Sequence, residues 1–447
     1  MKKQMTFLLA ILLLQSIAVA SDWSDQIKGK VDGHMKAHFA NQAQVGVIVG
    51  AVKGTEQHVW SWGEKVRGSG RMVNSDTFFE IGSITKTFVA TLLALELGRG
   101  RVDLNDPVSR YWPDLKGTDA GKITLVELAT HHSGLPRMPS GFTSAYPENP
   151  FKDYDSGKLL SFLKAFKQQK AGPYDYVYSN LGLGLLGFLL SEKLNGMTFT
   201  KYLDKYLLSP LGLYDIKVAV KEADLSRTAY GYSGFFDVTP FLELGSIEGA
   251  GVLRATGADL MRYVMYQMKP DNSELGKAMK LAQTPRADTD RPGTKIGLVW
   301  ESEKMGSYNV TDHGGATLGY RALAIFDREK QIGGIIMSNT ENYPRCLIGP
   351  LVEIECAVPA WAKLSESHVK KLAGVYSSKV LGIEGAIVSV NGFPGIQIVG
   401  QPKIRLWAVN EMELHVPELG VKIAFNPPEG GAYAGFNLTQ GGKTFYF

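Results

Sequence analysis

The sequence predicts an α/β protein followed by a small all-β part. Strand patterns occur at 44–62 and again at 296–339, and helical patterns fill most of the chain between them. One sheet built from distant parts of the chain, with a helical subdomain inserted, accounts for that order. After Ser365 short apolar or alternating runs punctuated by Gly, Pro and Asn replace the helices. We therefore expect one domain over 21–363 and a C-terminal antiparallel barrel or sandwich over 364–447.

Hydrophobic periodicity and turn residues define the individual elements. Gly54 separates two strands, and Gly98 follows the apolar helix that begins near Ile84. Further helices are predicted at 23–41, 124–130, 157–168, 181–194, 198–208, 256–268 and 347–363, and further strands at 296–301, 307–312, 320–327 and 332–339. Eight short strands and no helix are expected after Ser365.

The composition is that of a folded protein with almost balanced charge. Hydrophobic residues make up 44% of the 447 residues and charged residues 21%, which excludes disordered and fibrous classes. Lys and Arg number 48 against 44 Asp and Glu, and no basic run follows the pattern of a phosphate-binding tract. Nucleic acid is therefore not an expected partner.

The first twenty residues predict a secretory signal peptide. Lys2 and Lys3 precede an apolar run that ends near Leu14, and Ala18 and Ala20 form an A-x-A ending. The run is shorter than the ~20 residues that a membrane-spanning helix needs. We expect cleavage after Ala20 and a periplasmic or secreted mature protein without a stable membrane span.

The two cysteines allow one disulfide at most. If residues between Cys346 and Cys356 are helical, their separation of ~15 Å is too long for a bond, which favours two free thiols. Pro350 could break such a helix, so the pairing stays open at this point.

The candidate nucleophile is Ser83, which lies with Lys86 at the predicted start of a helix. Residues three apart share a helix face, so the amine can reach the hydroxyl. Lysine acts as a base toward serine when its pKa is depressed from about 10.4 toward neutrality. The Ser-x-x-Lys spacing recurs at Ser161 and Ser367, where solvated helix or linker residues explain it, so this motif alone is weak.

Two further motifs strengthen the match at Ser83. Tyr178 and Asn180 are two apart in an extended turn, so their side chains face the same way and can enter one cleft. His313 precedes two glycines at the end of a predicted strand, which suits close approach of a substrate backbone. Packing and turn formation explain either motif alone, but they are a poor explanation for all three motifs in one exported chain.

Longer stretches around these motifs match a known family: Phe79–Phe88, Leu104–Val108, Tyr111–Pro113, Ile123–Pro136 and Tyr178–Asn180. Across residues 40–345 the chain resembles the serine β-lactamase and penicillin-binding-protein superfamily, in its class C β-lactamase branch. The resemblance implies an antiparallel sheet flanked by helices, with a helical subdomain. His313–Thr317 stands where the family carries Lys-Thr-Gly.

The resemblance also implies an acyl-enzyme mechanism. Ser83 attacks a carbonyl, while Lys86 and Tyr178 share the acid–base work. Asn180 holds the substrate amide and helps to orient Lys86. The third motif lines the substrate site through His313, Gly315 and Ala316, and the Ala316 amide joins that of Ser83 in an oxyanion hole. The family mechanism needs no cofactor and no metal.

Two departures from the family pattern bear on substrate choice. His313 replaces a lysine, so the charge of the third motif should depend on pH, with a step in rate at roughly pH 6–7. Gly249–Gly251 lacks the aromatic residue that class C enzymes usually carry, which implies a wider cleft. Relatives with His-x-Gly include D-aminopeptidases and esterases, and some of these carry a C-terminal lipocalin-like domain, as expected here for 364–447.

The predicted function is hydrolysis, through an acyl-serine, of the amide of a β-lactam or of a D-amino-acid-containing, peptidoglycan-type peptide. A carboxylesterase that cleaves small acyl esters is the nearest alternative. A non-catalytic penicillin-binding module is a third alternative. The presence of Ser83, Lys86 and Tyr178 counts against it, because a protein that has lost catalysis usually lacks one of its catalytic residues. The expected partner is a small-molecule or peptide substrate, and the sequence leaves the choice among β-lactam, peptide and ester open.

Overall fold

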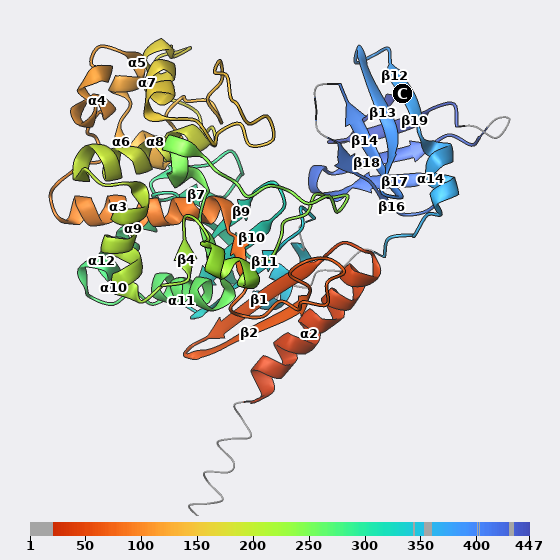
Figure 1. Ribbon diagram of the computed structural model, residues 1–447, viewed down its shortest axis with the longest axis horizontal. Coiled ribbons are helices and arrows are strands. Elements are labelled where there is room, and N and C mark those ends of the chain that lie inside the picture. Colours follow the sequence, from red (N-terminus) through yellow and green to blue (C-terminus); the bar gives the residue numbers. More distant parts are fainter. Residues whose placement is uncertain (1–20, 343–344, 353–359, 400, 402, 429–432) are drawn as a thin grey trace, which may run out of the picture. The chain divides into compact units, whose positions relative to one another are not determined.

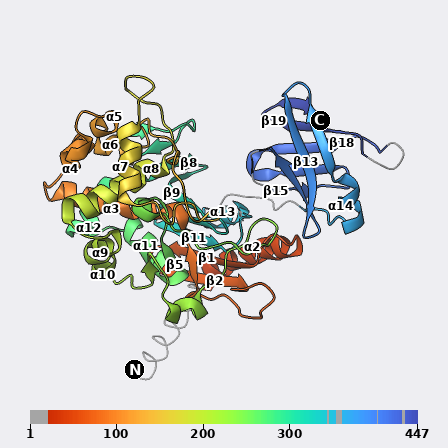
Figure 2. The ribbon, with the colours of Figure 1, turned by 45° about the horizontal axis from the view of Figure 1, so that its top comes forward.

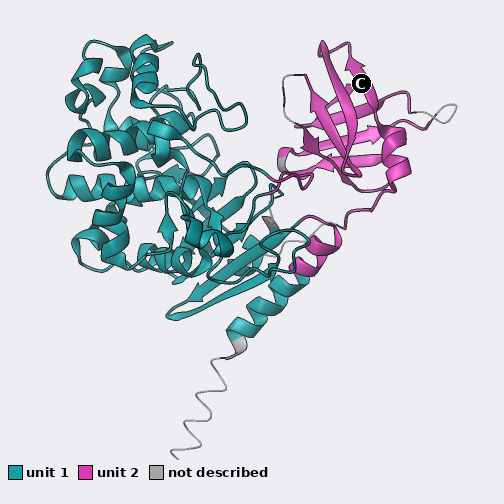
Figure 3. Ribbon diagram, in the orientation of Figure 1, with its two compact units in different colours: residues 1–33, 44–231, 239–356 teal, residues 34–43, 232–238, 357–447 magenta. Residues whose placement is uncertain are grey.

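The computed structural model describes residues 21–342, 345–352, 360–399, 401, 403–428 and 433–447. The chain divides into two compact units (Figure 3): unit 1 comprises residues 1–33, 44–231 and 239–356, and unit 2 comprises residues 34–43, 232–238 and 357–447. The predicted signal segment, residues 1–20, lies outside the described residues. Among the residues that are described, no helix has both the length and the apolar character needed to cross a bilayer.

An eight-stranded antiparallel sheet forms the centre of unit 1 (Figure 1). Its order is β2-β1-β11-β10-β9-β8-β7-β6, so the first two strands pair with the last one. Gly50 of β1 lies opposite Ile335 of β11, which confirms that distant parts of the chain share one sheet. The strands are β1 Gly46–Lys53, β2 Glu56–Gly63, β6 Ala287–Asp288, β7 Lys295–Ile296, β8 Glu301–Met305, β9 Tyr308–Ala316, β10 Arg321–Asp327 and β11 Ile332–Ser338.

Helix α3 (Thr85–Gly98) is the buried axis of unit 1. Every residue from Thr85 to Glu96 is buried, as expected for a helix that is apolar around its whole circumference. Helices α4 to α8 cluster beyond α3, on the side away from β1 and β2 (Figures 1 and 2). This cluster is the predicted helical subdomain.

The remaining elements of unit 1 are short or peripheral. The helices are α2 Ser21–Ala40, whose last residues fall in unit 2, α4 Val108–Tyr111, α5 Asp119–Lys122, α6 Leu125–Ala129, α7 Ser156–Ala165, α8 Asn180–Phe188, α9 Phe199–Leu203, α10 Ser209–Leu211, α11 Gly257–Met268, α12 Glu274–Ala282 and α13 Ile348–Leu351. Short 3-10 helices are η1 Gly82–Ile84, η2 Pro113–Leu115, η5 Glu222–Arg227, η6 Gly245–Ala250 and η7 Arg345–Leu347. Two π-helical segments are η3 Leu189–Leu194 and η4 Asp204–Leu208. A small sheet joins β3 Phe78–Glu80, β5 Arg254–Thr256 and β4 Ile216–Lys217.

Unit 2 contains two antiparallel sheets around their own apolar core. The four-stranded sheet has the order β12-β13-β14-β15 and the five-stranded sheet the order β16-β17-β18-β19-β20, so consecutive strands are neighbours. Within the described residues the two sheets are not closed into the predicted barrel. The strands are β12 Gly374–Ser378, β13 Ile383–Val390, β14 Phe393–Ile398, β15 Ile404–Arg405, β16 Trp407–Ala408, β17 Glu413–Val416, β18 Val421–Phe425, β19 Phe436–Gln440 and β20 Lys443–Tyr446.

Two local predictions near the junction were wrong, and the state of Cys346, which the sequence left open, is now known. A helix, α14 (Glu366–Leu372), follows Ser365, where only strands were expected, and the Ser365 hydroxyl caps it by accepting from the His368 amide. Of the helix predicted at 347–363, the described residues contain only α13 (Ile348–Leu351), and residues 360–364 are not helical. Cys346 is disulfide-bonded rather than a free thiol, while the only other cysteine, Cys356, lies outside the described residues.

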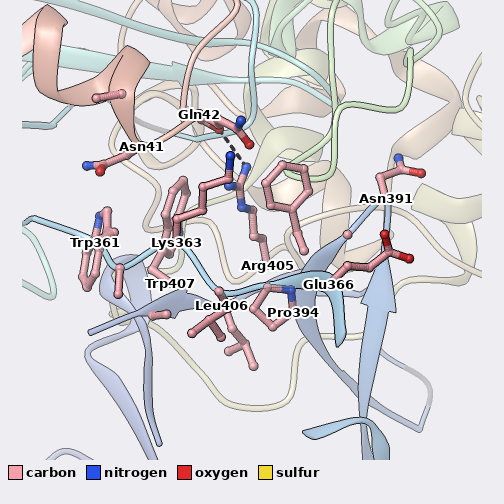
Figure 4. A pocket seen from close by; sticks show the side chains of 16 residues that line it. Asn41, Gln42, Trp361, Lys363, Glu366, Asn391, Pro394, Arg405, Leu406 and Trp407 are labelled. Atoms are coloured by element: carbon pink, nitrogen blue, oxygen red, sulfur yellow. Dashed lines mark hydrogen bonds between the residues drawn. The ribbon is translucent and has the colours of Figure 1, made fainter. Parts of the chain in front are cut away.

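Unit 2 also contains a pocket of about 270 Å³ built around Arg405 (Figure 4). The Arg405 guanidinium lies 3.8 Å from the ring centre of Phe393 and 4.2 Å from that of Trp407. It donates hydrogen bonds to the carbonyl oxygens of Gln42, at 3.0 Å, and Gly234, at 3.1 Å. The described lining of this pocket contains no serine, threonine or cysteine, so a serine or cysteine nucleophile is not found there.

Candidate active site

Ser83 and Lys86 meet at the start of the buried helix α3. Ser83 lies in the single turn η1, and Lys86 in the first turn of α3 donates a hydrogen bond of 2.8 Å to its hydroxyl oxygen. Lys86 also donates to the carbonyl oxygen of Ala250, at 2.5 Å, and its side chain is fully buried. Burial, and then the positive charge of Arg137, lower the lysine pKa well below its ordinary value. A lowered pKa makes it easier for Lys86 to lose its proton and to act as the base that serine activation requires.

The end of strand β9 packs directly against the nucleophile turn. A Cβ atom on Gly315 would lie 1.9 Å from the carbonyl oxygen of Ile81, and one on Gly82 would lie 2.7 Å from the amide nitrogen of Ala316. Gly82 also has a φ of +50°, a conformation that glycine adopts at little cost. Glycine at both positions therefore brings the Ala316 backbone beside Ser83, as an oxyanion hole from these two amides requires.

Tyr178 is the third group at the nucleophile. The Lys86 amine lies 4.9 Å from the centre of the Tyr178 ring. Burial raises the pKa of Tyr178 to about 12, and a hydrogen bond with Ser83 and the charge of Arg137 limit the rise. The phenol is therefore protonated at neutral pH, so it can donate a proton while Lys86 accepts one.

His131 and the backbone of Arg137 hold the Tyr178 segment in place. His131, at a φ of +62°, accepts a hydrogen bond of 3.0 Å on Nδ1 from the Ser179 amide, and its ring lies 4.4 Å from that of Tyr178. The amide of Asn180 donates to the carbonyl oxygen of Arg137. Sequence reasoning could not find this role of His131, because its contacts come from a segment almost fifty residues away.

Asn180 differs from expectation in its contacts. Its side-chain amide donates to the Met138 sulfur at 3.3 Å. In the described part of the chain it makes no hydrogen bond to Lys86, whose amine is oriented by Ser83 and Ala250 instead. Binding of a substrate amide by Asn180 stays a prediction.

A cavity of about 340 Å³ opens onto these groups. It brings together five residues predicted from the sequence, namely Ser83, Tyr178, His313, Gly315 and Ala316. The other two predicted residues, Lys86 and Asn180, are not part of the cavity lining, although Lys86 is hydrogen-bonded to Ser83. Sequence reasoning missed three charged residues of the lining, which are Arg137, Glu301 and Arg321.

His313 is a neutral group in this cavity, so the expected pH-dependent charge was wrong. Its side chain is 5% exposed, and Nδ1 lies 2.7 Å from the carbonyl oxygen of Gly314. Because a carbonyl oxygen only accepts, Nδ1 carries the hydrogen in this arrangement. Burial, followed by repulsion from Lys86, lowers the pKa of His313 to about 3. The third motif therefore adds no positive charge at neutral pH.

This neutrality predicts the pH dependence of turnover. Because the imidazole of His313 is uncharged above about pH 4, it contributes no step to kcat/KM between about pH 5 and 8. We expect His313→Asn and the wild type to share the shape of their kcat/KM profiles. A limb near pH 6–7 that is present in the wild type and missing in His313→Asn would contradict the assignment.

The same burial predicts acid destabilisation. In the unfolded chain His313 takes up a proton near pH 6.5, the ordinary pKa of histidine, whereas in the folded chain its pKa is only about 3. The unfolded state thus binds more protons, and the free energy of unfolding decreases as the pH falls below 6.5. The slope is about 1.4 kcal/mol per pH unit for this imidazole. Urea unfolding at pH 7, 6 and 5 should show a slope shallower by about that amount in His313→Asn, and equal slopes would refute the prediction.

A serine hydroxyl activated by a buried amine, with a phenol beside it and a strand backbone facing it, defines a serine hydrolase. Comparison with known proteins agrees with that class. The family described as Beta-lactamase matches residues 31–349. The chain therefore belongs to the β-lactamase family.

Individual relatives and solved structures agree with this assignment. The β-lactamase of Pseudomonas fluorescens is 29% identical over 279 residues, which cover 62% of this chain and 74% of the relative. The β-lactamase of Lysobacter lactamgenus is 30% identical over 268 residues, which cover 59% and 66%. A class C β-lactamase structure has a TM-score of 0.68 at 23% identity and covers 75% of this chain and 99% of its own. A β-lactamase/D-alanine carboxypeptidase from Pseudomonas syringae has a TM-score of 0.65 at 22% identity and covers 74% and 100%. At these identities the structures show a shared fold.

Proposed function

We propose that this protein hydrolyses the amide of a β-lactam or of a D-amino-acid-containing peptide through an acyl-enzyme at Ser83. The observation that carries the proposal is the 2.8 Å hydrogen bond between Ser83 and the buried Lys86, whose pKa is lowered by burial. Related proteins named β-lactamase and a fold shared with a β-lactamase/D-alanine carboxypeptidase support the choice of substrate class.

The proposed reaction begins when Lys86 takes the proton of the Ser83 hydroxyl and the oxygen attacks the substrate carbonyl. The amides of Ser83 and Ala316 stabilise the negative charge that develops on the carbonyl oxygen. The C–N bond then breaks, and Tyr178 supplies the proton that the leaving nitrogen needs. Lys86 returns its proton to Tyr178, water attacks the acyl-serine, and the carboxylic acid leaves with Ser83 restored.

We also propose that the enzyme acts outside the cytoplasm. The A-x-A ending at Ala20 supports a cleaved signal peptide, and the disulfide at Cys346 suits an oxidising compartment. N-terminal sequencing of the protein secreted or exported by its host tests this point, and an intact Met1 terminus would contradict it.

A labelling experiment combined with a substrate panel tests the proposed reaction. Purified protein is incubated with a fluorescent penicillin or a fluorophosphonate, and the adduct is located by mass spectrometry. We expect the adduct on Ser83 and turnover of a cephalosporin or a D-Ala-D-Ala peptide. Turnover of a short acyl ester alone would make the protein a carboxylesterase, and labelling without turnover would make it a penicillin-binding module. An adduct on Ser161 or Ser367 would refute the mechanism.

A further inference from the structure

We propose that Arg137 binds a carboxylate group of the substrate and thereby selects anionic acyl compounds. The inference rests on the proposed function and names the substrate feature that the site recognises. Arg137 immediately follows the matched stretch that ends at Pro136, and no role for it was inferred from the sequence.

The backbone at Arg137 is fixed to the segment that carries Tyr178. Its carbonyl oxygen accepts hydrogen bonds from the amides of Asn180, at 2.9 Å, and Leu181, at 3.2 Å. The neighbouring carbonyl oxygen of Pro136 accepts from the Ser179 hydroxyl at 2.7 Å. Two segments that are about forty residues apart in the chain therefore hold this backbone in one position.

The side chain of Arg137 extends from this fixed point into the reaction cavity. Its guanidinium carbon lies 5.1 Å from the centre of the Tyr178 ring, and the residue lines the cavity together with Ser83. Arg137 is exposed, so a ligand can reach its guanidinium, a group that carries a positive charge in proteins. Among the described residues, the contact that the Arg137 guanidinium makes is with the face of the Tyr178 ring, and it takes part in no ion pair or side-chain hydrogen bond there.

The other charged groups of the cavity are already engaged. Glu301 forms an ion pair with Arg291 and accepts a hydrogen bond of 3.0 Å from the Tyr176 hydroxyl. Arg321 donates to the carbonyl oxygens of Thr317 and Tyr320, both at 2.9 Å, and lies 3.6 Å from Glu341.

His313 is buried against the Gly314 carbonyl oxygen, and the Lys86 amine is directed to Ser83 and Ala250. Arg137 is thus the cation of this cavity that is available to a substrate. A guanidinium presents a planar pair of donors that fits the two oxygens of a carboxylate. A carboxylate held there would position the scissile carbonyl in the cavity that Arg137 shares with Ser83.

The test compares a substrate that carries a carboxylate with its methyl ester, at the same scissile amide. The readout is the ratio of the two kcat/KM values, because any effect of Arg137 on the acidity of Tyr178 applies to both substrates and cancels. We expect Arg137→Gln to lower this ratio roughly 10- to 100-fold, and Arg137→Lys to lower it less, since charge remains but paired donors are lost. Arg71→Gln, at an exposed arginine outside the cavity lining, is the matched control.

An unchanged ratio in Arg137→Gln would overturn the inference. A decrease in Arg321→Gln without one in Arg137→Gln would assign carboxylate binding to the other guanidinium and would also overturn it. Labelling of Ser83 by a neutral fluorophosphonate distinguishes this failure from failure of the proposed function. If the wild-type protein is labelled at Ser83 and the ratio of kcat/KM values is unchanged in Arg137→Gln, the proposed mechanism stands and only the specificity assignment fails.

Discussion

Ser83→Ala should abolish turnover, with a loss of about 10⁴-fold or more in kcat, because Ser83 is the only serine or threonine in the described lining of the reaction cavity. The measurement is steady-state hydrolysis together with covalent labelling of the variant. Ser161→Ala is the matched control, since Ser161 stands in a second Ser-x-x-Lys pattern on the surface of α7. A Ser83→Ala protein that keeps wild-type turnover would exclude the acyl-serine mechanism.

Lys86→Met should lose about 10²- to 10⁴-fold in kcat while the fold is retained, because methionine replaces much of the buried volume but cannot take the serine proton. Lys86→Ala is the less informative variant, since it leaves a cavity next to the Ala250 carbonyl oxygen as well. Circular dichroism and unfolding temperature separate loss of the base from loss of the fold. A folded Lys86→Met protein with more than a tenth of wild-type kcat would contradict the role of Lys86 as base.

The contact between Ser83 and Lys86 was predictable because it is local. Ser83 in η1 and Lys86 in the first turn of α3 are three residues apart in continuous helical backbone, and this spacing alone brings the two side chains together. The approach of Tyr178 was predictable only through the family resemblance, since nothing in its own segment points to Ser83. The carbonyl oxygen of Ala250 could not be predicted as a partner of Lys86 from residue types, because every residue carries a carbonyl group.

The errors at His313 and α14 have different physical origins. The charge of His313 depends on burial and on the approach of Lys86, which are tertiary properties that its sequence neighbourhood does not contain. Helix α14, in contrast, carries local signals that were overlooked. Ser365 is a capping residue, Glu366 lies in the first turn, and Lys370 lies in the last turn. The residues that follow have the short apolar and alternating runs typical of strands. Because α14 is only seven residues long, that pattern concealed its capping signals.

Gly315→Ala tests the other half of the site, the backbone of strand β9. The added Cβ would lie 1.9 Å from the carbonyl oxygen of Ile81 and 3.4 Å from the amide nitrogen of Ser83, so the strand must move away from the nucleophile turn. Displacing the Ala316 amide from the oxyanion site should lower kcat by about 10²- to 10³-fold. The same overpacking should cost about 1–3 kcal/mol in the free energy of unfolding.

Gly314→Ala is the control for this variant, because it adds the same methyl group one residue earlier in the same strand. Its Cβ would meet only the carbonyl oxygen of Ala322, at 3.9 Å, which is ordinary van der Waals contact. Gly314→Ala should therefore leave the unfolding temperature within about 2 °C of the wild type, whereas Gly315→Ala should lower it further. Since Gly314 lines the cavity, the comparison uses thermal unfolding and fluorophosphonate labelling of Ser83 instead of turnover. Equal unfolding temperatures and equal labelling rates for the two variants would show that strand β9 does not press against the Ser83 turn, and the oxyanion hole would then have to be formed by other groups.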